Sequence, residues 1–172
     1  MLLLFAQILF VLFVFLLLLT AIVSMIMRVP YVPTKKKVIT HLLKIANLKP
    51  KQTVYDLGCG DGRLLIEAEK KYKVQSTGFE IAPLIYLLGL LRKWFSRSKI
   101  SIILGNFMKT SLKEADVIFC YLSPGILKKL APKLQKECVT GTRIYSESFH
   151  IEGMDPDKVY PQNKKEGLPI IY

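Results

Sequence analysis

The pattern of hydrophobic and polar positions divides the chain into two unequal parts. From Leu2 to Met27 the only polar side chains are Gln7, Thr20 and Ser24, and no charged residue interrupts the run. A helix of about 26 residues, rising about 1.5 Å per residue, is longer than the roughly 30 Å hydrocarbon core of a bilayer. The pattern therefore predicts a transmembrane helix at residues 1–27.

A cleaved signal peptide is the alternative for this segment. Such peptides carry a basic start, a shorter apolar core and a small-residue cleavage site, and the sequence shows none of these features. We therefore expect a retained single-pass anchor. Basic residues follow the run at Arg28 and at 35–37, which places the rest of the chain on the cytoplasmic side of the membrane.

After the anchor, short apolar runs alternate with segments of helical periodicity. The predicted strands are 53–57, 74–79, 100–104, 117–121 and 142–148, and the predicted helices are 35–46, 63–72, 83–95 and 125–137. A last apolar segment follows at 168–172. Alternation of this kind favours a mostly parallel sheet with helices on both faces. We expect a minimal, Rossmann-like, doubly wound α/β domain at 51–172, preceded by a proline-rich connector and a capping helix at 28–50, with Thr34 as the N-cap of that helix.

The most informative motif lies between the first predicted strand and the helix after it. Asp56 is followed by Gly58, Cys59, Gly60, Asp61 and Gly62, and then by Arg63. Glycines at alternate positions allow a tight turn and let a ligand approach the backbone closely. In a dinucleotide loop the third small residue falls at the position that Arg63 occupies here, which disfavours a nicotinamide oxidoreductase. The early carboxylate suits a cofactor that carries an ammonium and a sulfonium better than one that carries a pyrophosphate.

The ends of the next strands supply further candidates. Glu80 ends the second strand about twenty residues after the loop, where doubly wound folds place an acid that binds ribose hydroxyls; a solvated strand end is the alternative. Asn106 and Phe107 follow the third strand and can contact an adenine, although Gly-Asn is also a plain turn signal. The fourth strand runs into 121–124 at the edge where open α/β sheets bind ligands.

Charge and cysteine content narrow the class of protein. The chain has 25 basic and 13 acidic residues, a formal net charge of +12, and every charged residue lies beyond the anchor. The lysines are scattered and form no basic-aromatic motif of an RNA-binding module, so we expect an anionic membrane surface as the partner and no nucleic acid. Cys59, Cys120 and Cys138 are widely spaced and predict neither a disulfide framework nor a metal site.

One predicted helix has an unusual composition. Residues 84–95 are apolar nearly all round and end in Trp94 beside Arg92, Lys93 and Arg97. A helix apolar on all sides is buried or in contact with lipid, and this mixture is typical of a membrane interface. An ordinary sheet-covering helix with one apolar face is the alternative.

Taken with these motifs, the chain from Val29 to Tyr172 resembles the small membrane-associated class I methyltransferases, which include the lysine methyltransferases of the adenine nucleotide translocase and of the ATP synthase c-subunit. The resemblance rests on the connector 30–34, the loop 55–63, Glu80, the segment 121–124, and the segments 141–144 and 146–149. It implies S-adenosylmethionine as the cofactor and lysine of a membrane protein as the acceptor. The run 146–154 departs from the family pattern, so the implied acceptor rests on kinship alone.

The resemblance also implies roles for individual residues. We expect Asp56, Gly58, Gly60 and Gly62 to hold the methionine part of the cofactor, Glu80 the ribose, and Asn106 and Phe107 the adenine. Cys59 and Ile81 are also expected to contact the cofactor. We expect Tyr121, Leu122, Ser123 and Pro124 beside the departing methyl group, with Tyr31, Thr34 and Glu147 on the acceptor side. Two alternatives stay open: a membrane small molecule such as a quinone precursor or lipid as acceptor, and a non-catalytic membrane scaffold that keeps the fold.

Overall fold

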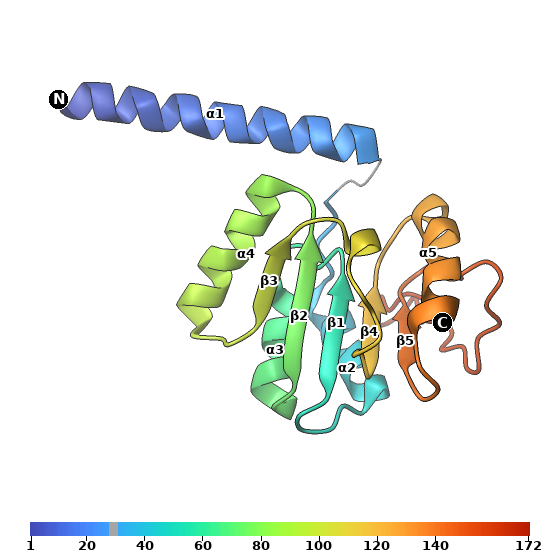
Figure 1. Cartoon of the computed structure of the whole chain (residues 1–172). Helices are drawn as coiled ribbons and strands as arrows, with labels where there is room; N and C mark the ends of the chain where they lie inside the picture. The colour runs from blue at the N-terminus through green and yellow to red at the C-terminus, as the bar shows by residue number, and fades with distance from the viewer. Residues whose placement is uncertain (28–30) are drawn as a thin grey trace.

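A parallel sheet forms the centre of the protein. The computed structural model describes residues 1–27 and 31–172, and within them the sheet has five strands in the order β3-β2-β1-β4-β5 (Figure 1). Its strands are β1 Thr53–Leu57, β2 Gln75–Glu80, β3 Ser101–Leu104, β4 Val117–Cys120 and β5 Arg143–Ser146. The helices of this part of the chain are α1 Leu2–Met27, α2 Lys36–Ala46, α3 Arg63–Tyr72, α4 Pro83–Ser96 and α5 Pro124–Glu137, with a short 3-10 helix η1 Phe107–Lys109.

The expected doubly wound fold is confirmed, because helices cover both faces of the sheet. Alternate residues of a strand point to opposite faces, so Val54 joins the core formed with α2 and α3, whereas Leu57 joins the core formed with α5. All strand pairs are parallel, and β1 lies between β2 and β4. The carboxyl ends of the strands therefore meet at one edge of the sheet, beyond which α1 crosses in Figure 1.

The predicted elements agree with the observed ones to within two residues at each end, apart from the last apolar segment. β5 ends at Ser146, short of the predicted 148, because Ser148 has a left-handed backbone with φ of 68°. The apolar segment 168–172 forms isolated antiparallel bridges, in which Ile171 pairs with Glu147 and Tyr160.

The expected cap of α2 is wrong. The N-cap position is Lys35, which makes no side-chain cap hydrogen bond. The Thr34 hydroxyl instead donates to Glu147 Oε2 at 3.3 Å, so this side chain turns toward the end of β5. Arg28, Val29 and Pro30, on which part of the connector prediction rests, lie outside the described residues.

Close packing brings the loop after β1 against the sheet. A Cβ added to Gly78 of β2 would lie 2.5 Å from Cys59 Sγ and 2.7 Å from Leu65 Cδ1. Contacts this short do not occur in proteins, so only glycine lets α3 and its preceding loop sit this close to β2. The loop is therefore held in place by its packing against β2.

The helix α1 stands apart from the domain core. Its stretch Leu2–Val23 has a mean hydropathy of 3.1 and none of it is buried within the protein. Among the described residues it is the one helix long and apolar enough to cross a bilayer, by length and composition alone.

Candidate active site

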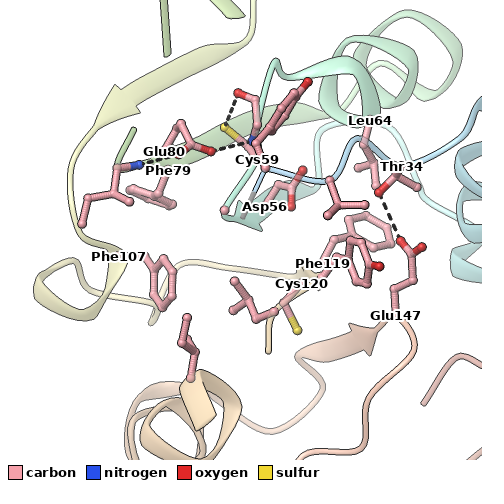
Figure 2. Close-up of a pocket in the computed structure, with 18 of the residues that line it drawn as sticks. Thr34, Asp56, Cys59, Leu64, Phe79, Glu80, Phe107, Phe119, Cys120 and Glu147 are labelled. Atoms are coloured by element: carbon pink, nitrogen blue, oxygen red, sulfur yellow. Dashed lines mark hydrogen bonds between the residues drawn. The ribbon is translucent and has the colours of Figure 1, made fainter. Parts of the chain in front are cut away.

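A cavity of about 540 Å³ opens at the carboxyl edge of the sheet. It is lined by the loop after β1, by the ends of β2, β4 and β5, and by the connector 31–34 (Figure 2). Its size is that of a site for a small-molecule ligand or cofactor. The position agrees with the general rule for ligand sites in open α/β sheets.

The glycine loop forms one wall of this cavity. Gly58, Gly60 and Gly62 all have left-handed backbones, with φ of 84°, 57° and 72°. A Cβ on Gly60 would lie 2.9 Å from the Tyr31 ring, so the connector lies directly over the loop. Glycine is required here both by conformation and by the space left between loop and connector.

Glu80 holds the loop in place. Its Oε2 accepts a hydrogen bond from Gly60 N at 2.9 Å, and its Oε1 accepts from Ile81 N at 2.9 Å and Ala82 N at 2.8 Å. A carboxylate has about four acceptor positions, so one remains for a ligand hydroxyl. The predicted ribose residue therefore has a second task, which is to fix the backbone of Gly60.

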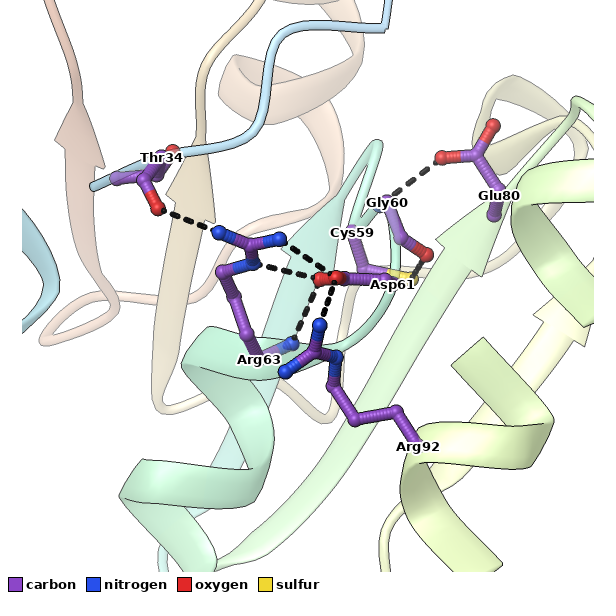
Figure 3. A network of polar contacts seen from close by, with 7 residues as sticks. All are labelled: Thr34, Cys59, Gly60, Asp61, Arg63, Glu80 and Arg92. Atoms are coloured by element: carbon purple, nitrogen blue, oxygen red, sulfur yellow. Dashed lines mark hydrogen bonds and ion pairs between the residues drawn. The ribbon is translucent and has the colours of Figure 1, made fainter. Parts of the chain in front are cut away.

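A network of charged side chains ties the loop to its surroundings. Asp61 accepts hydrogen bonds from Arg63 Nη2 at 2.7 Å and Nε at 2.8 Å, and it forms an ion pair with Arg92 of α4 at 2.9 Å (Figure 3). Arg63 Nη1 also donates to Thr34 O at 3.3 Å. Burial alone would raise the pKa of Asp61, but the two guanidinium groups hold it below its ordinary value. This network joins the loop, α4 and the connector, and no local sequence pattern predicts it.

Three carboxylates that face the cavity form no ion pair with any residue that the structure describes. Asp56 and Glu147 are both buried at 7% exposure, and Glu80 at 9%. Burial, and then the charges of Glu147 and Glu80, raise the pKa of Asp56 to about 8. Burial also raises the pKa of Glu147 to about 7, although the hydrogen bond from Thr34 acts to lower it. Such a cluster favours a positively charged ligand, since a cation nearby restores the ionised form of each acid.

Aromatic side chains supply the remaining walls. Phe119 stacks on Tyr145 with ring centroids 5.5 Å apart, and Tyr121 stacks on Phe149 at 6.5 Å. Phe107 lies at the opposite end of the cavity, on η1 (Figure 2). Aromatic faces attract cations and exclude water. The donor set therefore fits S-adenosylmethionine: carboxylates for its ammonium and ribose, aromatic walls for its adenine and sulfonium, and open glycine backbone for its methionine part.

The structure brings most of the predicted site residues together. The cavity is lined by Tyr31, Thr34, Asp56, Gly58, Cys59, Gly60, Glu80, Ile81, Asn106, Phe107, Tyr121, Leu122, Ser123 and Glu147. Gly62 and Pro124 do not line it, because Gly62 caps α3 and Pro124 is the first residue of α5. The sequence analysis missed further lining residues, among them Met108, Phe119, Ile126, Lys129, Tyr145 and Phe149. Phe119 and Tyr145 lie within strands and have the residue types of an ordinary core, so no local sequence signal distinguishes them as site residues.

Comparisons with known proteins agree with this geometry. A relative named protein-lysine N-methyltransferase, from Saccharolobus islandicus strain REY15A, is 40% identical over 139 residues, which is 79% of this chain and 86% of the relative. The adenine nucleotide translocase lysine N-methyltransferase of Mus musculus is 29% identical over 132 residues, and the match spans 76% of this chain but only 57% of that protein. This chain thus spans little more than half the length of the mouse relative.

A solved structure shares the same fold and holds the product form of the cofactor. The RNA methyltransferase from Salinibacter ruber, in complex with S-adenosyl-L-homocysteine, superposes with a TM-score of 0.76 and 29% identity, covering 82% of this chain and 91% of that one. The model of the ANTKMT methyltransferase domain matches residues 56–158, from the last part of β1 to beyond β5. With the glycine loop, the acid Glu80 and these relatives in agreement, the chain is an S-adenosylmethionine-dependent methyltransferase and belongs to the ANTKMT methyltransferase domain family.

Proposed function

We propose that this enzyme N-methylates a lysine side chain of a membrane protein, with its domain held at the cytoplasmic face of the membrane. The observation that carries the proposal is the buried carboxylate of Glu147, which faces the same cavity as Asp56 and has no basic partner among the described residues. A buried acid without a cation suits an incoming amine. The names of the relatives, which include lysine methyltransferases, support the same acceptor.

The cavity has two ends, which suit a donor and an acceptor. Phe107 and Glu80 lie at one end and Glu147 with Thr34 at the other, with Asp56 between them (Figure 2). We assign the end near Phe107 to the adenosine part of the cofactor and the end near Glu147 to the lysine. The expected roles of Asn106 and Ile81 beside the cofactor belong to the same proposal.

When bound, S-adenosylmethionine would supply an electrophilic methyl group on its sulfonium for transfer to a nucleophile. The residues of the protein must therefore align the amine, remove its proton and exclude water. We assign to Glu147 the removal of the proton from the lysine ammonium. The Thr34 hydroxyl orients the Glu147 carboxylate by donating to its Oε2. The stacked rings of Tyr121 and Phe149 wall the cavity and keep the amine desolvated, with Leu122 and Ser123 alongside.

The membrane location rests on α1 and on charge. The helix is apolar enough to span a bilayer, and the excess of 12 positive charges lies wholly in the remainder of the chain. Each surface Lys or Arg near an anionic leaflet contributes about 1 kcal/mol of attraction. A domain of this charge, tethered by such a helix, is suited to acceptors embedded in the same membrane.

The acceptor class can be tested with labelled S-adenosylmethionine. The full chain, reconstituted in vesicles, is incubated separately with membrane proteins, with extracted lipids and quinones, and with total RNA from its source cells. We expect label in the protein fraction, at lysine in tandem mass spectra, and none with the Gly60→Arg variant. Label confined to lipid or to RNA would overturn the lysine proposal, and so would the absence of label from the protein fraction.

A further inference from the structure

The outer side of α4 and the adjoining edge strand form an uncovered apolar surface. We call it the α4–β3 patch, and it consists of Leu87, Leu91, Trp94 and Phe95 on α4 with Leu104 on β3. Trp94 is 71% exposed and Phe95 75%, and their rings contact each other with centroids 4.8 Å apart. Exposed clusters of large apolar side chains mark interaction sites.

The opposite side of α4 is fixed to the domain. Ile85 and Gly89 are buried, and a Cβ on Gly89 would lie 3.0 Å from Ile102 Cδ1. Arg92 reaches back to Asp61 in the charged network described above. The helix therefore has one defined orientation, in which Leu87, Leu91, Trp94 and Phe95 face away from the sheet.

A hydrogen bond joins the start of α4 to the apolar helix α1. Ala82, the N-cap of α4, provides no side-chain acceptor, and Leu84 N donates to Thr20 Oγ1 of α1 at 3.0 Å. The first N–H groups of a helix have no acceptor within the helix. In hydrocarbon there is no water to accept their hydrogen bonds, so the protein must supply an acceptor. Thr20, one of the few polar side chains of α1, thus supplies the acceptor that water would otherwise provide at the start of α4.

This contact sets the depth of α4 relative to α1. Thr20 lies seven residues before the last residue of α1, Met27, which corresponds to about 10 Å along a helix. Interfacial helices bury their apolar sides about 5–10 Å into the boundary between headgroups and acyl chains. In Figure 1 α4 runs crosswise to α1, and the end of α4 nearer to α1 is its first turn, where Leu84 N donates to Thr20 Oγ1.

We propose that the α4–β3 patch lies in the headgroup boundary of a bilayer that contains anionic lipid. The inference rests on the proposed membrane location and extends it from the anchor to the catalytic domain. Lys93 and the exposed Arg97 and Lys99 flank the apolar residues and suit lipid phosphates. Tryptophan at the end of such a helix is typical of this boundary.

The placement limits the acceptors that the enzyme can reach. Glu80 and Ala82 come directly before α4, and Glu80 lines the cavity. With α4 at the bilayer surface, the cavity lies beside the headgroups. Acceptor lysines are then those that lie within or just above the headgroup layer, rather than those of a distant soluble domain.

The chain contains a single tryptophan, Trp94, which provides a direct test. The full chain is reconstituted in phosphatidylcholine vesicles containing phosphatidylglycerol, with and without phosphatidylcholine brominated in the upper acyl chain. We expect the brominated lipid to quench most of the Trp94 fluorescence and aqueous iodide to quench little of it. This readout is independent of methyl transfer, so it can fail while the proposed function stands.

Two variants make the result specific. Leu87→Glu combined with Leu91→Glu should lift α4, so that iodide quenches Trp94 and brominated lipid no longer does. Val139→Glu is the control, because Val139 is an exposed apolar residue outside the patch, after α5. This variant should show the same quenching as the parent. Fluorescence quenched by iodide in the parent would overturn the proposal. Fluorescence shielded from both quenchers would also overturn it and would point to a second copy covering the patch.

Discussion

An Asp56→Asn variant is expected to bind S-adenosylmethionine about 10- to 100-fold more weakly than the parent and yet to unfold at a higher temperature. The loss of affinity corresponds to a hydrogen bond to a charged group, about 1.5–3 kcal/mol. The gain in stability arises because the ligand-free fold must keep a proton on Asp56, whose pKa is about 8 instead of its ordinary 3.8. Calorimetric titration and thermal unfolding of the full chain in detergent measure the two effects.

The sign of the stability effect follows from proton binding. Between about pH 4 and pH 8 the native state holds a proton on Asp56 that the unfolded chain releases. Stability of the ligand-free parent therefore falls as the pH rises through this range. At pH 7 the free energy of unfolding of the Asn variant should exceed that of the parent by about 2–4 kcal/mol, after a discount for relaxation of the buried site. For a chain of this size the melting temperature should rise by roughly 5 °C or more.

The same argument predicts that cofactor affinity of the parent rises with pH up to about 8, where Asp56 becomes ionised. Asp116→Asn is the matched control, because Asp116 is exposed at the opposite edge of the sheet and accepts from Thr53 N at 2.7 Å. That variant should keep its affinity and lose a little stability. Undiminished affinity in Asp56→Asn would contradict the assignment of this carboxylate to the cofactor.

A Glu147→Gln variant is expected to keep its affinity for S-adenosylmethionine within a few-fold and to lose methyl transfer by about 10²-fold or more. Gln preserves the shape of the side chain and can still accept from Thr34, but it cannot take the proton of an ammonium, a step that contributes about 10²–10⁴-fold. In the parent, kcat should rise with pH up to about 7, the pKa of Glu147. The variant should lose that dependence.

Glu152→Gln controls for a general effect of removing an acid. Glu152 is exposed and pairs with Lys128 at 3.1 Å on the protein surface, so its loss should change neither kcat nor the pH profile. If Glu147→Gln lost cofactor affinity instead and kept its turnover at saturating cofactor, Glu147 would belong to the cofactor end of the cavity. The acceptor assignment would then be wrong.

The sequence alone predicts the strands, the helices and the composition of the cofactor loop. Periodicity and glycine spacing are local signals, so β1 and α3 agree with their predicted limits residue for residue. The parallel order of the sheet places the ends of β1, β2 and β4 at one edge, which is why Asp56, Glu80 and Tyr121 meet in one cavity. These residues could be predicted because strand ends are recognisable in sequence.

Contacts between distant segments could not be predicted in the same way. Thr34 is of a residue type that commonly caps helices, yet its hydroxyl donates to Glu147, 113 residues later in the chain. The pairing of Asp61 with Arg92 depends on how α4 packs against α3, and no local pattern encodes that packing. Glu80 likewise reads as a ribose residue, and its bond to Gly60 N appears only when the loop is folded.

The central claim is tested most directly by calorimetric titration of the full chain in detergent with S-adenosylmethionine, alongside a Gly60→Arg variant. Gly60 has a left-handed backbone and lies under the Tyr31 ring, so an arginine there fills the cofactor loop. We expect binding in the micromolar range by the parent and none by the folded variant. Absence of binding by the folded parent at millimolar cofactor would contradict the account.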